Sequence, residues 1–124
     1  MTATVSKHLD GDTLAAALTS GIHRVIADQE LLNSINVFPV ADSDTGTNLS
    51  LSLGSALGVL GDPEEKDLGT MLSAVADALL DGSRGNSGAI VAQFFQGMSD
   101  SAGELTRFTT YTFAKAVEKG NEYA

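Results

Sequence analysis

Two aspartates, Asp42 and Asp44, stand two residues apart in a segment that separates two apolar helical patterns. Outside a helix, two such carboxylates can converge on one point only if a positive charge lies between them, because like charges at contact distance repel. A hard divalent cation with oxygen ligands is the natural candidate. The segment, residues 36–48, has the sequence NVFPVADSDTGTN, which is longer and more polar than an ordinary connection. We therefore predict a binding site here.

The residues that follow the two carboxylates favour a phosphate beside the cation. Gly46 can adopt a positive φ, so the backbone can turn sharply, and the Thr47 hydroxyl can then cap the next helix. The N-terminus of that helix carries a positive partial charge, which attracts phosphate and not a cation. A metal and a phosphate together fit these residues better than a metal alone.

The acidic segment has two simpler interpretations. Aspartates and a glycine before a helix are equally typical of caps and turns. A calcium-binding EF-hand requires glycine at its sixth position and glutamate at its twelfth. Counted from Asp42, Gly46 is at the fifth position and Leu53 at the twelfth, so calcium sensing is excluded.

A second glycine-rich segment, residues 81–88, has the sequence DGSRGNSG and precedes an apolar helical pattern. Several glycines at a helix start can expose backbone N–H groups together, which is how loops hold phosphate oxygens. A Walker A loop is excluded because no lysine follows the last glycine. A nucleophile elbow is excluded because Ala89 replaces its final glycine and both histidines lie upstream of Ser87. We infer that the acidic segment supplies the metal and this segment the amides.

Composition limits the partners. The 124 residues carry a formal net charge of −9 with only seven Lys and Arg, which argues against nucleic acid or an anionic membrane. A nucleotide would need cations to bind so acidic a chain. There is no cysteine, so disulfides and thiolate chemistry are excluded. Without a signal segment or a long apolar run, we expect a cytoplasmic protein.

The apolar spacing predicts five helices and no convincing strand, which implies an all-α antiparallel bundle of amphipathic helices. Residues 1–11 are expected to form a loose arm, and residues 12–124 one helical unit. The expected helices run from a cap at Asp12 to about Ile35, from about Thr47 to Leu60, from Leu68 to Leu80 after a cap at Asp67, from Ala89 to Met98, and from about Phe108 onward.

Three single residues carry further expectations. Gly54 and Gly58 lie four apart on the second predicted helix, where each costs about 1 kcal/mol relative to alanine. We expect another backbone to approach closely there, with a bend as the alternative.

His23 lies near an apolar stripe and is expected to be a partly buried structural residue and not a ligand.

The two motifs together resemble the nucleotide-binding L domain of the dihydroxyacetone kinase family, most closely the catalytic subunit of bacterial fatty-acid kinases. That family has the patterns NVFPVPDGDTGTNM and, later, GARGNSG. Residues 36–49 here are NVFPVADSDTGTNL, and residues 82–88 are GSRGNSG. The resemblance extends over nearly the whole chain but covers only the first part of the family's domain. Ala41 and Ser43 depart from the family's proline and glycine, and neither removes a ligand.

The resemblance implies a helical barrel whose loops at one end hold ATP or ADP with two Mg²⁺ ions. By that likeness Asp42 and Asp44 are metal ligands, and Asn36 is a third ligand with less support. The nucleotide-contacting residues implied are Thr45, Gly46, Thr47, Asn48, Ser83, Arg84, Gly85, Asn86 and Ser87.

The reaction implied is transfer of the γ-phosphoryl group to a fatty-acid carboxylate that a separate lipid-carrying protein presents. A carboxylate is already ionised at neutral pH, so no general base is needed. The alternatives are a dihydroxyacetone-type kinase subunit, a non-catalytic truncated paralogue that binds partner helices or forms a homodimer, and an unrelated bundle with Asp-rich caps. The resemblance also implies further helices and a later nucleotide loop after Ala124, so activity of this chain alone is not expected.

Overall fold

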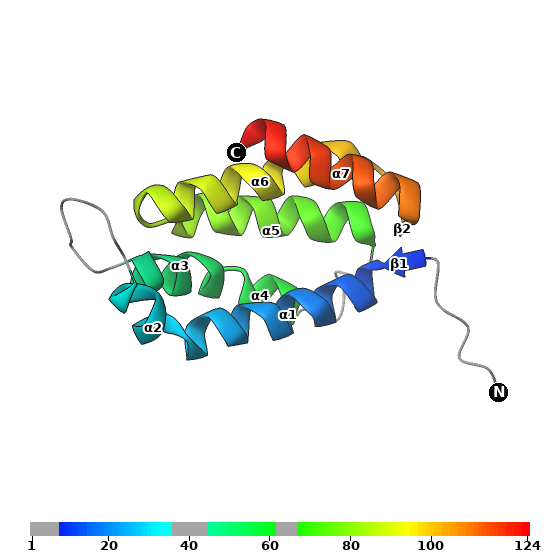
Figure 1. The fold of residues 1–124 in the computed structure, drawn as a ribbon. Coiled ribbons are helices and arrows are strands. Elements are labelled where there is room, and N and C mark those ends of the chain that lie inside the picture. The colour runs from blue at the N-terminus through cyan, green and yellow to red at the C-terminus, as the bar shows by residue number, and fades with distance from the viewer. Residues whose placement is uncertain (1–7, 36–44, 62–66) are drawn as a thin grey trace.

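The structure, a computed structural model, describes residues 8–35, 45–61 and 67–124. These residues form seven helices and two short strands, which confirms the all-α bundle. The elements in order are β1 (His8–Asp10), α1 (Gly11–Ala27), α2 (Gln29–Ser34), α3 (Thr45–Gly54), α4 (Leu57–Leu60), α5 (Leu68–Gly82), α6 (Gly85–Ala102), β2 (Arg107–Thr109) and α7 (Thr110–Tyr123). Figure 1 shows α1 to α4 in one layer and α5 to α7 in the other. In the described residues, no helix is both long and apolar enough to cross a membrane.

The central helix is α5, whose apolar stripe is buried as its spacing predicts. Its apolar side chains Leu68, Met71, Leu72, Val75 and Leu79 are each at most 2% exposed. Asp67 caps this helix as predicted, since its carboxylate accepts a hydrogen bond from the Thr70 N–H. Helix α5 contacts α1, α3 and α4 of the other layer and α6 of its own layer, so its stripe organises the core.

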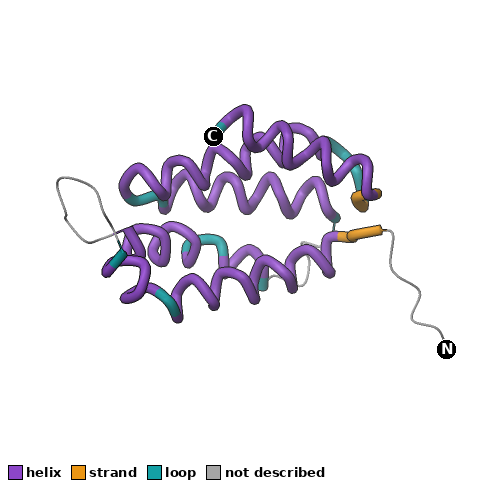
Figure 2. Tube along the Cα trace, in the orientation of Figure 1, coloured by secondary structure: helices purple, strands orange, loops and turns teal. Residues whose placement is uncertain are grey.

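The expected arm is wrong for its last four residues. His8 to Asp10 form β1, which pairs antiparallel with β2, and Gly11 begins α1. Figure 2 shows both strands at the end of the bundle where α1 begins. The helix cap is Asp10 and not Asp12: its carboxylate accepts from the Thr13 N–H at 2.8 Å, which lowers the pKa of Asp10. Residues 1–7 lie outside the described part.

Two predicted helices are each divided in the structure. The first is interrupted at Asp28, which lies between α1 and α2 and whose carboxylate accepts from the Arg24 side chain at 2.8 Å. The second is interrupted at Ser55 and Ala56, whose N–H groups donate to carbonyls three residues back instead of four. A Cβ built on Gly54 or on Gly58 would contact nothing within 4 Å. The close approach expected at these glycines is therefore wrong, and the bend is what the structure shows.

Helices α6 and α7 cross at two glycines. A Cβ on Gly97 would lie 2.5 Å from the Lys119 carbonyl oxygen, and one on Gly120 would lie 2.8 Å from the Phe94 ring. Close backbone approach explains why both positions are glycine.

The fourth predicted helix, Ala89 to Met98, extends beyond its expected limits at both ends. In the structure α6 begins at Gly85 and ends at Ala102.

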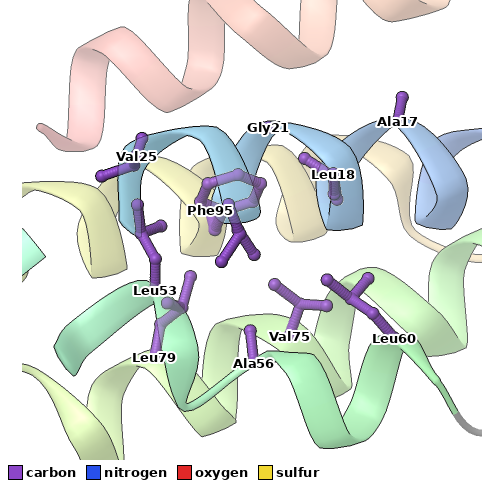
Figure 3. Close-up of a pocket in the computed structure, with 11 residues that line it drawn as sticks. Ala17, Leu18, Gly21, Val25, Leu53, Ala56, Leu60, Val75, Leu79 and Phe95 are labelled. Carbon is purple, nitrogen blue, oxygen red and sulfur yellow. The ribbon is translucent and has the colours of Figure 1, made fainter. Parts of the chain in front are cut away.

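A cavity of about 260 Å³ lies between the layers and is lined by apolar residues of α1, α3, α4, α5 and α6 (Figure 3). Gly21 of α1 lies at its wall, and a Cβ there would contact nothing within 4 Å. None of the predicted site residues lines this cavity.

We expect Gly21→Ala to raise the free energy of unfolding by about 1 kcal/mol, because alanine has the higher helix propensity and the site has room for a methyl group. Urea unfolding of the two proteins measures the difference. Unchanged or lower stability would show that the wall of the cavity cannot accept the added carbon.

Candidate functional site

The three predicted metal ligands, Asn36, Asp42 and Asp44, lie outside the described residues. Their segment connects α2 to α3, so the described residues that flank it define where its two ends lie. In the described part of the chain, no group of three or more His, Cys, Asp or Glu residues is placed to hold a metal ion. The metal prediction therefore rests on the sequence, whereas the residues predicted to contact phosphate lie in the described part of the chain.

The starts of α3 and α6 lie against each other. A Cβ built on Gly85 would lie 2.6 Å from Nδ2 of Asn48, and Gly85 has a positive φ of 66°. One turn further along both helices, Gly88 lies against the Ser52 side chain. The two helices therefore run parallel with their N-termini together, at the end of the bundle where α2 ends (Figure 1). The described residues of the first motif, 45–49, therefore meet the second motif at this end.

Two parallel helix N-termini form an environment that favours an anion. The first turn of a helix has N–H groups without intrahelical partners, and its dipole places positive partial charge there. Arg84 is the N-cap of α6, its side chain is exposed, and it makes no capping hydrogen bond to the first turn. Asn86 is exposed and Ser87 half-buried on the same turn. The first turn of α6 is thus at least partly accessible at the kind of helix start that binds phosphate in other proteins.

The segment predicted as a glycine loop is mostly helix. Only Ser83 and Arg84 separate α5 from α6, because α6 begins four residues before the predicted Ala89. Gly85, Asn86 and Ser87 form the first turn of α6. The prediction that this segment presents amides at a helix start is compatible with this geometry, whereas the position of that start was wrong.

Ser52 is a residue that the sequence reasoning missed. Its side chain is fully buried, and its Oγ accepts a hydrogen bond from the Arg84 N–H at 2.8 Å. This bond fixes the connection between α5 and α6 against α3. The signal was present in the sequence: small polar residues recur at 48, 52 and 55, on one face of the helix predicted for 47–60, and glycines recur at 82, 85 and 88. Such a face allows close helix contact.

Thr47 is not the cap that was predicted. Helix α3 begins at Thr45, and Thr47 lies in its first turn. Its N–H donates to Oδ1 of Asn33 at 3.0 Å, so a side chain from α2 caps α3. Gly46 is also used differently, since the described glycines with positive φ are Gly85 and Gly103. A Cβ on Gly46 would overlap the Gln29 carbonyl oxygen, so glycine is needed there for close packing on α2.

His23 does not fit its predicted role, because its side chain is exposed on α1 and not partly buried. It lines a surface depression formed by the outer face of α1 and residues 60–61, which is distinct from the site at the start of α3. The spacing placed His23 near the apolar stripe, but the helix turns it toward solvent.

Gly88→Ala is expected to lower the free energy of unfolding by about 1 to 3 kcal/mol, because its Cβ would displace the Ser52 hydroxyl from the Arg84 N–H. Denaturant unfolding measures the change. The double substitution Gly88→Ala with Ser52→Ala removes the clashing oxygen, so its cost should be less than the sum of the single costs. Additive costs would show that the methyl group added at position 88 does not contact the Ser52 side chain.

Comparison with known proteins agrees with the motifs. The family profile of the DAK2 domain matches residues 39–124. Protein YloV of Bacillus subtilis is 36% identical over 116 residues, which are 94% of this chain and 21% of that protein. An uncharacterized protein of Staphylococcus saprophyticus is 33% identical over 120 residues, which are 97% of this chain and 22% of that protein. The chain thus spans about one-fifth of the length of these relatives. It belongs to the DAK2 domain family.

Proposed function

We propose that this chain provides the nucleotide-binding part of an ATP-dependent phosphotransferase. The observation that supports it is the contact between Asn48 and Gly85, which brings the N-termini of α3 and α6 together at the end of the bundle where the acidic segment begins and ends. The phosphates of ATP or ADP would lie against these two helix starts. Asp42 and Asp44, with Asn36 as the third ligand, would hold two Mg²⁺ ions, which neutralise phosphate charge when bound.

The residues of the chain have separate tasks in this proposal. The exposed N–H groups at the start of α6 and the Arg84 guanidinium bind phosphate oxygens, while the packing of Asn48 against Gly85 keeps the two helix starts in register. By the family resemblance, Thr45, Gly46 and Thr47 would contact the nucleotide from the α3 side. The acidic chain thus contributes few positive side chains of its own, and bound cations supply the rest.

The acceptor is proposed to be a fatty-acid carboxylate that a separate lipid-carrying protein presents, as in the fatty-acid kinases. An ionised carboxylate attacks phosphorus without losing a proton, so this acceptor needs no general base. A dihydroxyacetone-type acceptor would have a hydroxyl proton to remove, and would therefore need a base. We place the protein in the cytoplasm, where ATP and Mg²⁺ are available.

A non-catalytic binding module is the second candidate. Large apolar side chains are exposed on several helices, including Leu51 at 56%, Leu80 at 57% and Ile90 at 52%. Such side chains favour contact with partner helices or with a second copy. Measurement of the molecular mass in solution tests whether two copies of the chain associate.

A nucleotide titration of the full-length gene product, with Mg²⁺ and with EDTA, tests the proposal. We expect ATP and ADP to bind in Mg²⁺ and to lose measurable affinity in EDTA, because the cations neutralise the phosphates against an acidic chain. Equal affinity in both buffers would contradict the proposal that Mg²⁺ bridges the protein and the nucleotide. No binding in either buffer would favour the non-catalytic module.

A further inference from the structure

Two amide side chains on α2 hold one hydroxyl on α3. Nε2 of Gln29 lies 3.2 Å and Nδ2 of Asn33 lies 3.0 Å from Oγ1 of Thr47. The two amides are four residues apart, so they extend from the same face of α2. All three side chains are half-buried. The contact joins the helices on either side of residues 36–44.

The hydrogen bonds fix how Thr47 can act. The Oδ1 atom of Asn33 accepts from the Thr47 N–H at 3.0 Å, so the Asn33 amide is oriented and its Nδ2 is the atom that faces Oγ1. A hydroxyl has two acceptor lone pairs and one donor proton. Two N–H donors occupy both lone pairs, and the N–H of Thr47 is already used. What Thr47 can offer a ligand is its hydroxyl proton.

The packing around the contact leaves little freedom. Gly46 lies so close to α2 that a Cβ would overlap the Gln29 carbonyl and lie 3.0 Å from Oδ1 of Asn33. Asn48, the residue after Thr47, lies against Gly85 at the start of α6. Thr47 is therefore held between α2 and the meeting point of the two helix starts.

We propose that Gln29 and Asn33 are positioning residues that orient the Thr47 hydroxyl so that its proton donates to a phosphate oxygen of the nucleotide. The inference rests on the proposed function and adds two residues that do not touch the ligand. Amides suit this task better than carboxylates, because a carboxylate would accept the hydroxyl proton itself and would repel the phosphate.

The substitution Asn33→Asp separates this role from a structural one. Aspartate keeps the size of the side chain and the acceptor for the Thr47 N–H, and a negative charge near the first turn of α3 favours the helix. The ligand-free protein should therefore unfold at the same or a higher temperature. Affinity for Mg-ATP should fall by about 10-fold or more, the weight of one hydrogen bond to a charged group. Gln29→Glu should act in the same direction.

Controls identify the route of the effect. Ser34→Asp adds the same charge to the next residue of α2, whose hydroxyl bonds only the Leu31 carbonyl among the described contacts, and should change affinity little. In Thr47→Val there is no hydroxyl to orient, so adding Asn33→Asp should reduce affinity by clearly less than it does in the wild type.

The outcomes distinguish the two proposals. If the wild type binds Mg-ATP and Asn33→Asp binds it as tightly, the positioning role is wrong while the proposed function stands. An equal effect of Asn33→Asp with and without the Thr47 hydroxyl also overturns the positioning role. If the wild type does not bind Mg-ATP, both proposals fail.

Discussion

Replacing Asp42 or Asp44 with alanine is expected to weaken Mg-dependent nucleotide binding by about 100-fold or more, the scale of removing one partner from a desolvated charged contact. Each carboxylate would otherwise supply a hard oxygen ligand to a cation that bridges the protein and the phosphates. The net charge of −9 makes the loss severe, because without the cation the triphosphate meets an acidic protein. Calorimetric titration with ATP at fixed Mg²⁺ measures the effect.

Stability provides the internal control for that experiment. Two neighbouring carboxylates repel each other when no cation is bound, so neither substitution should lower the free energy of unfolding in EDTA. Asp77→Ala removes the same charge from the exposed face of α5 and should leave nucleotide affinity nearly unchanged. Asp42→Asn keeps a neutral amide oxygen that can still ligate the cation, so it should weaken binding by less than Asp42→Ala. Unchanged affinity in the Asp42 and Asp44 variants would rule out the metal site.

The fold class could be predicted because apolar spacing is a local property of the chain. The stripe of α5, from Leu68 to Leu79, was predicted and is buried. The interruptions were harder, since no glycine or proline marks the break at Asp28. The strands could not be seen, because Leu9 pairs with Phe108 and the pairing depends on how the whole bundle closes.

The site divides in the same way. The motifs alone predicted that residues near Asn48 and Gly85 act together, and the structure brings these two residues into contact. The motifs could not predict which residues from other helices hold the site residues in place. Asn33 caps α3 from another helix, and Ser52 holds the Arg84 N–H across 32 residues of sequence. Such bonds depend on helix packing, which local patterns do not specify.

Gly46→Ala is expected to destabilise the protein by about 2 to 3 kcal/mol and to weaken nucleotide binding as well. A Cβ there would overlap the Gln29 carbonyl oxygen and lie 2.9 Å from Cβ of Leu32. Both obstacles belong to the body of α2, so α3 must move away from it, at the cost typical of overpacking. The same movement would break the bonds from Asn33 to Thr47. Urea unfolding and Mg-ATP titration measure the two effects.

Comparison of Gly46→Ala with Gly46→Asn decides why glycine is required. If the position needed a positive φ, asparagine would be the better tolerated residue, because it adopts that conformation more readily than alanine. If it needs space against α2, asparagine has the same Cβ and a larger side chain, so it should be at least as damaging. We expect the second result. Gly58→Ala is the matched control: a Cβ there meets nothing within 4 Å, so the same change of residue should leave stability equal or higher, because only the contact with α2 makes the substitution at Gly46 costly.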